Sequence, residues 1–482
     1  MGVISGALPL MTPSLNLSER QQEWVVGILY VGGGLGAAIG GYLCDAMGRK
    51  ATILLTDVLF VVGAIILFLS RDINQIWIGR FIVGMGISIS GIADVSYLHE
   101  IAPISWRGSI VSVNEACISL GFLLAFGSAV WLQNVTDGWR HMFGIAGYLA
   151  IIQFLGMIFM PESPVWLQQQ GKLEDRDEVL HLIYGKVTTD STIIEDIDDD
   201  TKCMEDTTFQ FKQFDGIVSS PFVSREATYD ALVSPREKVS ISSQVYSNYT
   251  TRVQSVMYIL SRYKAQISIS LFLSIAQQLS GQVAILNYAP LIFSRLNHSD
   301  LSTTLWIGVV KFLVTVIVIW RVERYGRRPL LLLGMIMIIS GQCLLAFAFS
   351  LVDNQQNLPE SAISWALIGV ILVVSGYSCS FGPLTWLLTS ELFPTNIRGR
   401  ALGASTITTY FSAALVTSTF LSLQTVIGNS AVFLLFGVVT LIGLIFVFAA
   451  IPDTGGKSPK EIDTEIRSMN FWGNAESHGS IT

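Results

Sequence analysis

Four amide side chains lie within one apolar stretch, between about Ile267 and Phe293. They are Gln277, Gln278, Gln282 and Asn287. An amide both donates and accepts hydrogen bonds, which suits the hydroxyl groups of a polyhydroxylated solute. In hydrocarbon an amide is costly unless it faces a protein interior or a watery cavity. The stretch therefore predicts a solute-binding membrane helix, and a polar contact between helices is the alternative.

Gly281 and Pro290 lie within the same stretch. Both weaken helix continuity, which is tolerated at membrane depth only where the freed backbone groups find other partners. A broken helix beside amides is typical of the substrate site of a transporter.

Ionisable residues also lie in other apolar runs, among them Arg80, Glu115 and Lys311. Burying two opposite charges unpaired would cost several kcal/mol each, so we expect Glu115 and Lys311 to share a pocket. The alternative for these two residues is a static ion pair. The alternative for Arg80 is a helix-end residue whose guanidinium reaches the membrane surface.

The composition is that of a membrane protein: 51% of the 482 residues are hydrophobic and only 13% are charged, against about 25% charged in soluble domains. Five scattered cysteines show neither metal-ligand nor redox spacing, and we interpret them as small apolar fillers. Counting a short first run, six apolar runs precede a long polar stretch and six follow it. They lie near residues 2–11, 24–43, 51–69, 76–98, 109–132, 141–160, 266–293, 305–322, 330–351, 362–388, 401–427 and 430–451.

The predicted fold is an all-α multi-pass membrane protein with two six-helix bundles. We expect an N-terminal bundle at residues 1–160, a loop at 161–264, a C-terminal bundle at 265–451 and a tail at 452–482. Short helices are expected early in the loop, followed by an acidic, Ser- and Thr-rich disordered segment.

Lysine and arginine concentrate in alternate loops, which predicts that both termini and the long loop are cytosolic. The sequons at Asn16, Asn134 and Asn297 then fall outside and are candidate glycosylation sites. The membrane is either the plasma membrane or an endomembrane.

The two halves repeat each other. An acid-x2-Gly-Arg-basic pattern ends at Lys50 and again at Arg328, and a Glu-x6-Arg pattern runs from Glu100 to Arg107 and from Glu391 to Arg398. Two parallel six-helix halves are the architecture of a rocking transporter.

Six motifs now identify a family that the chain resembles, the sugar porters of the major facilitator superfamily. They are residues 2–8 (GVISGAL), 79–81 (GRF), 161–167 (PESPVWL), 277–281 (QQLSG), 382–386 (GPLTW) and 452–456 (PDTGG). Glu115, Lys311 and the pair Gly281-Gln282 make the chain most similar to the class III facilitative glucose transporters.

This resemblance implies a hexose bound between the halves. Gln277 and Gln278 would bond sugar hydroxyls, Asn287 and Tyr288 would line the outer side, and Trp386 would pack on the sugar ring. Thr409 stands where the family often has Asn, and Glu115 and Lys311 stand where relatives carry site-lining Gln and Asn. Four departures make the preferred sugar uncertain, namely Val283, Asn287, Ser378 and Ala46.

The resemblance also implies ion-pair latches between the bundles at the cytosolic side when the outer gate is open. The residues are Arg49, Glu100, Arg107, Glu162, Glu323, Arg327, Glu391 and Arg398. Ordinary positive-inside topology is the alternative, but it explains the arginines and not the glutamates.

In proton-coupled relatives an Asp in the first helix pairs with the arginine at the position of Arg80, which makes Arg80 a candidate coupling residue. The motif places that acid immediately before Met1. We therefore expect a truncated first helix, from either an incomplete reading of a longer chain or a splice form with impaired transport.

The predicted function is facilitative transport of a glucose-like hexose by alternating access. A proton-coupled sugar or polyol symporter is the alternative, and a non-transporting sensor is disfavoured by the short tail. No nucleophile–base set, metal spacing or phosphate loop indicates an enzyme, so we expect no cofactor, metal or nucleic acid. The expected partners are a monosaccharide, the bilayer and, in the coupled alternative, protons, with a monomeric transport unit.

Overall fold

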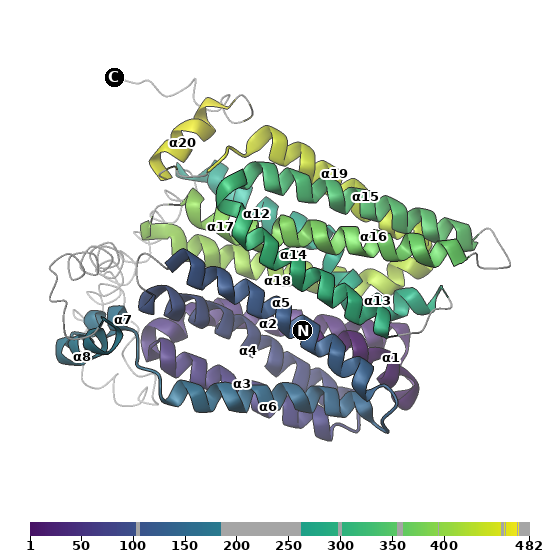
Figure 1. Cartoon of the computed structure of the whole chain (residues 1–482), viewed down its shortest axis with the longest axis horizontal. Helices are drawn as coiled ribbons and strands as arrows, with labels where there is room; N and C mark the ends of the chain where they lie inside the picture. The colour runs from purple at the N-terminus through teal and green to yellow at the C-terminus, as the bar shows by residue number, and fades with distance from the viewer. Residues whose placement is uncertain are drawn as a thin grey trace, which may run out of the picture.

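The computed structural model describes residues 1–102, 107–184, 262–296, 301–353, 360–393, 395–454, 457, 459–469 and 471. These residues are nearly all helical (Figure 1). The first half contains α1 (Val3–Leu15), α2 (Glu19–Met47), α3 (Arg49–Leu69), α4 (Ile73–Ile101), α5 (Arg107–Leu132), α6 (Gly138–Ile158), α7 (Pro164–Gln169) and α8 (Leu173–Tyr184). The second half contains α12 (Lys264–Leu279), α13 (Gln282–Ser294), α14 (Ser302–Tyr325), α15 (Arg327–Asp353), α16 (Glu360–Cys379), α17 (Phe381–Leu392), α18 (Thr395–Ile427), α19 (Asn429–Ala450) and α20 (Pro459–Ser468).

Eleven spans in the described part of the chain are long and apolar enough to cross a membrane. Two of them are broken helices, formed by α12 with α13 and by α16 with α17. The predicted all-helical multi-pass fold is confirmed. α1 is shorter than these spans, with 13 residues.

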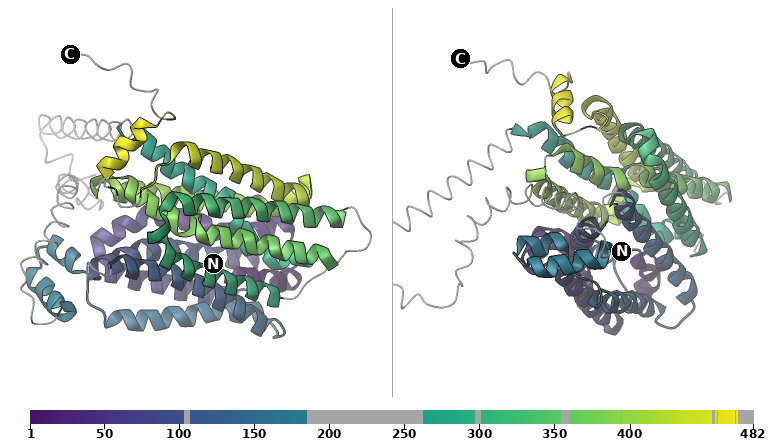
Figure 2. Two further views of the ribbon diagram at one scale, coloured as in Figure 1. Left: turned by 45° about the horizontal axis from the view of Figure 1, so that its top comes forward. Right: turned by 60° about the vertical axis from the view of Figure 1, so that its left-hand side comes forward.

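The helices form two bundles, α1–α6 and α12–α19, which lie side by side in all views (Figures 1 and 2). Large apolar side chains such as Tyr148, Ile152 and Phe448 point outward and are exposed. An apolar outer surface is what lipid tails require of a membrane protein.

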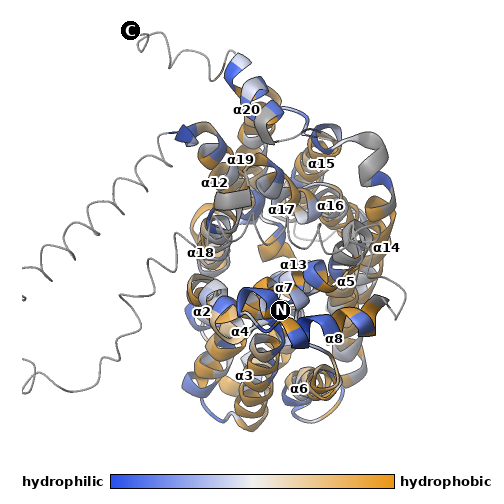
Figure 3. Cartoon of the chain, turned by 90° about the vertical axis from the view of Figure 1, so that its left-hand side faces the viewer, coloured by the Kyte–Doolittle hydropathy of each residue, from blue (hydrophilic) through white to orange (hydrophobic). Residues whose placement is uncertain are grey.

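The short helices α7, α8 and α20 lie at one end of the bundles, which we call the α20 end (Figure 3). The opposite end carries the turn at Asn16 between α1 and α2, and we call it the Asn16 end. There α2 begins with a capping box, because the Ser18 hydroxyl accepts from the Gln21 amide and the Gln21 side chain accepts from the Ser18 amide.

The break predicted in the amide-rich helix lies at Gly281, which has a φ of +80°. A side chain there would be strained, and a Cβ would come within 2.4 Å of the Phe436 ring. The Gln342 amide donates a 2.7 Å hydrogen bond to the Ser280 carbonyl, which satisfies a backbone group beside the break. Pro290 does not break the helix but lies within α13.

A second break, at Ser380 between α16 and α17, is not foreseen from the sequence. The Ser380 side chain fits against α15, because a Cβ on Gly334 would lie 2.5 Å from it. Both breaks lie in the C-terminal bundle and adjoin α15.

The bundles contact each other through α2 with α18, α5 with α14 and α1 with α13. Gly27 and Gly33 of α2 fit closely against Ser418 and Tyr410 of α18. Nearer the α20 end, a Cβ on Gly41 of α2 would have no heavy atom of a neighbouring element within 4 Å. A Cβ on Gly399 or Gly403 of α18 would likewise have no neighbouring heavy atom within 4 Å. The two helices therefore touch towards the Asn16 end and diverge towards the α20 end.

Candidate functional site

The four amides of the broken helix are buried. Gln277 is only 3% exposed, and Gln278, Gln282 and Asn287 are buried as well. The Gln277 Nε2 donates to the Tyr377 hydroxyl at 2.7 Å and to the Phe381 carbonyl at 3.3 Å. Its Oε1 is buried and has no hydrogen-bond partner among the described residues. Gln277 thus presents a fixed acceptor that a ligand hydroxyl could satisfy.

Asn287 connects the two bundles directly. Its Nδ2 donates to the Tyr30 hydroxyl of α2 at 2.9 Å and to the Val283 carbonyl at 2.7 Å. An amide of α13 is therefore held against the N-terminal bundle, within reach of any solute bound between the bundles.

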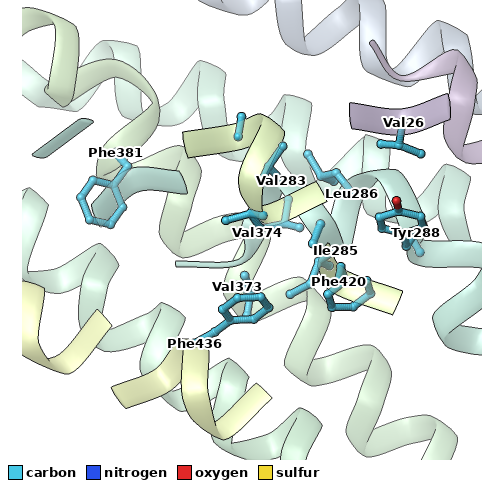
Figure 4. Packing of buried hydrophobic residues seen from close by; sticks show 14 of the residues in the cluster. Val26, Val283, Ile285, Leu286, Tyr288, Val373, Val374, Phe381, Phe420 and Phe436 are labelled. Atoms are coloured by element: carbon cyan, nitrogen blue, oxygen red, sulfur yellow. The ribbon is translucent and has the colours of Figure 1, made fainter. Parts of the chain in front are cut away.

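Tyr288 is hydrogen-bonded to the C-terminal bundle, although its hydroxyl lies on the side of Val26 of α2 (Figure 4). Its hydroxyl donates to the Thr417 carbonyl at 2.8 Å and its ring stacks on Phe420 at 5.3 Å between centroids. The side chain is fully buried. In this conformation it anchors α13 on α18.

Trp386 lies on α17 and is partly buried, and Thr409 lies on α18 and is buried. The hydroxyls of Ser378, Thr385 and Thr409 are buried and have no hydrogen-bond partner in the described part of the chain. Three successive helical segments of the C-terminal bundle thus hold unused donors and acceptors.

Glu115 of α5 and Lys311 of α14 interact electrostatically across the bundles. Lys311 is 6% exposed, its Nζ lies 3.5 Å from the Ser119 hydroxyl, and it sits 5.4 Å from the centroid of the Phe122 ring. Among the described residues the two charges form no direct ion pair within 4.0 Å. The two charges are near enough to interact but are not within ion-pair distance.

Arg80 of α4 is 3% exposed and lines a cavity of about 230 Å³ in the N-terminal bundle, together with Phe60, Leu67 and Phe143. One guanidinium nitrogen lies 3.4 Å from the Val26 carbonyl, and Nε has no partner in the described residues. The charge also interacts with the Tyr30 and Tyr288 hydroxyls.

The latch residues at the α20 end pair within each bundle. Arg49 binds Glu100 at 2.9 Å, and Glu162 accepts from the Arg49 and Lys50 amides at 3.0 Å each. Arg327 binds Glu391 at 3.2 Å. The side chains of Arg107, Glu323 and Arg398 lie outside the described residues.

A contact at the Asn16 end was not predicted from the sequence. Glu23 of α2 is 2% exposed, and its carboxylate accepts from the Ser422 amide and the Ser422 hydroxyl of α18, both at 2.6 Å. Nearby, Glu19 accepts from Thr425 at 3.0 Å and lies 3.8 Å from Arg295. We call the Glu23–Ser422 contact the clasp. The only signal in the sequence was an acid at the start of an apolar run.

Removing the clasp should favour forms that open at the Asn16 end. Two hydrogen bonds to a buried carboxylate contribute about 1.5–3 kcal/mol each, so Glu23→Ala should raise the population of such forms roughly tenfold or more. A cysteine placed at Ser418, behind the clasp, should then react faster with a membrane-impermeant thiol reagent. Glu19→Ala is the matched control, because Glu19 is exposed and its contacts should matter little. Equal labelling rates in Glu23→Ala and parent would show that the clasp does not hold this end closed.

Two of the sequon asparagines are exposed in turns at the Asn16 end. Asn16 ends α1 in a left-handed conformation, and Asn134 follows α5. Asn297 lies outside the described residues.

The paired bundles, the broken helices and the buried polar groups between them define a membrane transporter of the major facilitator fold. A solved structure described as the inward open conformation of the xylose transporter XylE from E. coli has this fold, with a TM-score of 0.74, 24% identity, and coverage of 96% of this chain and 95% of that one.

The family model "Sugar (and other) transporter" matches residues 2–223 and 234–466. The chain belongs to this family and is a transporter, not an enzyme. It is 31% identical over 485 residues to "D-xylose-proton symporter-like 3, chloroplastic" of Arabidopsis thaliana, covering 97% of this chain and 79% of that protein. It is 29% identical over 470 residues to "Glucose transporter GlcP" of Staphylococcus epidermidis, covering 97% and 93%.

Proposed function

We propose that this sugar transporter carries a glucose-like hexose down its gradient by alternating access. One observation carries the proposal: the buried Gln277 Oε1, held in place beside the break at Gly281, has no protein partner in the described chain. A sugar hydroxyl would donate to it. A relative named as a glucose transporter covers nearly the whole chain and supports a hexose. The subgroup we favour is the class III facilitative glucose transporters, from Glu115, Lys311 and Gly281-Gln282.

The bound sugar would contact the C-terminal bundle first. Gln277 and Gln278 bond its hydroxyls, Trp386 packs on its ring, and Thr409 offers a further polar group from α18. Asn287 links the sugar site to the N-terminal bundle through its hydrogen bond to the Tyr30 hydroxyl. Tyr288 positions α13 rather than touching the sugar in this conformation.

The α20 end is proposed to face the cytosol, because the arginine-rich turns after α2 and α14 lie there. Asn16 and Asn134 then face outside and are glycosylation candidates. In this proposal the conformation is inward-facing and the clasp closes it at the outside. When the clasp opens, Arg49, Glu100, Arg327 and Glu391 would exchange partners across the bundles and close the cytosolic side.

A proton-coupled symporter is the second candidate. A relative named as a D-xylose-proton symporter favours it, as does Arg80, a buried guanidinium without a carboxylate partner in the described residues. In that case sugar uptake would draw protons with it.

Labelled hexose uptake in transporter-deficient cells, with and without a proton gradient, tests the proposal. Saturable uptake that is insensitive to collapse of the gradient supports the facilitative carrier. Uptake that requires the gradient supports the symporter. Normal surface expression with neither uptake nor exchange of any hexose, pentose or polyol would point to the sensor instead.

A further inference from the structure

Asp57 is a buried acid in the middle of the N-terminal bundle. It lies on α3, within a candidate membrane span, and its side chain is 0% exposed. Both carboxylate oxygens lack a hydrogen-bond partner in the described residues. An ionised carboxylate left unpaired in an apolar interior costs several kcal/mol, and such a group takes up a proton instead.

A second acid, Asp94, lies on α4, the helix packed most extensively against α3. The antiparallel register of α3 and α4 is fixed by close approaches of Gly63 to Val83 and of Phe60 to Gly86. Further along the two helices, Ile53 of α3 and Ala93 of α4 pack in one apolar cluster. This register places Asp57 opposite residue 89 of α4, about one and a half helical turns from Asp94. The two carboxyl groups interact electrostatically.

Asp94 is half-buried and has one polar partner, the Ser90 hydroxyl at 2.5 Å. It is the more exposed member of the pair, whereas Asp57 is fully buried.

The other charged groups on the helices packed against α3 lie near the two ends of the bundle. At the α20 end, Asp45 of α2 and Glu100 of α4 pair with Arg49. At the Asn16 end, Arg140 of α6 pairs with Asp137. These charges are satisfied where they lie, away from the middle of α3.

Three further titratable groups of α4 and α6 also lie elsewhere. Tyr97 donates to the carbonyl of residue 161, and His141 packs against the ring of Phe68 near the end of α3. Arg80 lies about four turns from Asp94 along α4. Asp94 is the charged group that acts on Asp57.

We propose that Asp57 and Asp94 form a proton-binding carboxyl pair inside the N-terminal bundle. A proton taken from water forms an O–H bond on Asp57, and the charge of the pair changes from −2 to −1. Two carboxylates at one site cannot both stay ionised at low cost, since each negative charge disfavours the other. The pair lies apart from the amides of the C-terminal bundle and does not depend on which sugar is carried.

Infrared titration of the purified full chain, with isotope-labelled aspartate to separate aspartic from glutamic acid groups, tests the pair. The parent should show a protonated aspartic acid band at neutral pH. Asp57→Asn should remove this band. Asp94→Asn should keep it but make it disappear at less alkaline pH than in the parent, because the neighbouring negative charge is gone.

Asp72→Asn is the matched control, since Asp72 is exposed at the start of α4, and it should leave the band unchanged. If Asp57→Asn does not fold, Asp57→Glu retains a carboxyl group and should retain a shifted band with glutamate labelling. A band that survives in Asp57→Asn, or a parent with no such band at neutral pH, would overturn the proposal. Neither result depends on sugar uptake, so the pair and the transport proposal can fail separately.

Discussion

Replacing Glu115 by alanine should abolish most sugar transport, and the double change Glu115→Lys with Lys311→Glu should restore a substantial part of it. The single change leaves Lys311 buried without its opposite charge, which typically costs about 3–5 kcal/mol. The exchange restores one positive and one negative charge in the same pocket between α5 and α14. Both charges act on each other across the bundles, so the loss should appear in transport and not only in folding.

Uptake should be measured per molecule at the surface for both singles and the double. The exposed pair Lys457–Glu465, whose charges lie 2.6 Å apart, provides the control, because exchanging an exposed pair should change little. If the double variant is no better than the worse single, Glu115 and Lys311 do not function as a pair.

Gln277→Ala should weaken sugar binding by roughly 1–2 kcal/mol, about tenfold in Kd. The loss arises because the buried Oε1 no longer accepts from a sugar hydroxyl. Binding of the hexose to purified protein, by calorimetry or by tryptophan fluorescence, measures it.

Tyr377→Phe separates this role from a structural one. It removes the Tyr377 hydroxyl, the shorter of the two hydrogen-bond partners of the Gln277 Nε2, but leaves Oε1 in place. A sugar-binding role predicts a much smaller loss in Tyr377→Phe than in Gln277→Ala. Equal losses would show that Gln277 serves only to hold α16 and α12 together.

Much of the fold could be predicted from the sequence, because bilayer thickness fixes the length of each apolar run and the repeated motifs relate the halves. The break at Gly281 was predictable, since only glycine adopts its left-handed conformation without strain. The break at Ser380 was not, because serine is compatible with a helix and the fit against Gly334 of α15 exists only in the folded bundle.

The burial of the amides could be predicted from the sequence, but the direction of each side chain could not. The amides were recognised from their cost in hydrocarbon. Asn287 and Tyr288 are predicted to line the outer side of the site, and successive residues of a helix point about 100° apart. Asn287 therefore reaches Tyr30 in the other bundle, whereas Tyr288 reaches Thr417 within its own.

The clasp and the Asp57–Asp94 pair depend on proximity that a single sequence does not reveal. Glu23 and Ser422 are 399 residues apart in the chain. Asp57 and Asp94 lie in separate apolar runs, and their electrostatic interaction appears only when α3 and α4 pack together. Nothing in the sequence pattern distinguishes either acid from a residue paired with a loop arginine.

The central claim, that sugar crosses by opening one end of the bundles at a time, can be tested by locking one end. In a background without the five native cysteines, Glu23→Cys with Ser422→Cys should form a disulfide across the clasp. Sugar exchange in proteoliposomes should be lost on oxidation and recovered on reduction, while each single-cysteine variant keeps its rate under both conditions. Exchange at the parent rate in the fully oxidised double variant would contradict alternating access between these bundles.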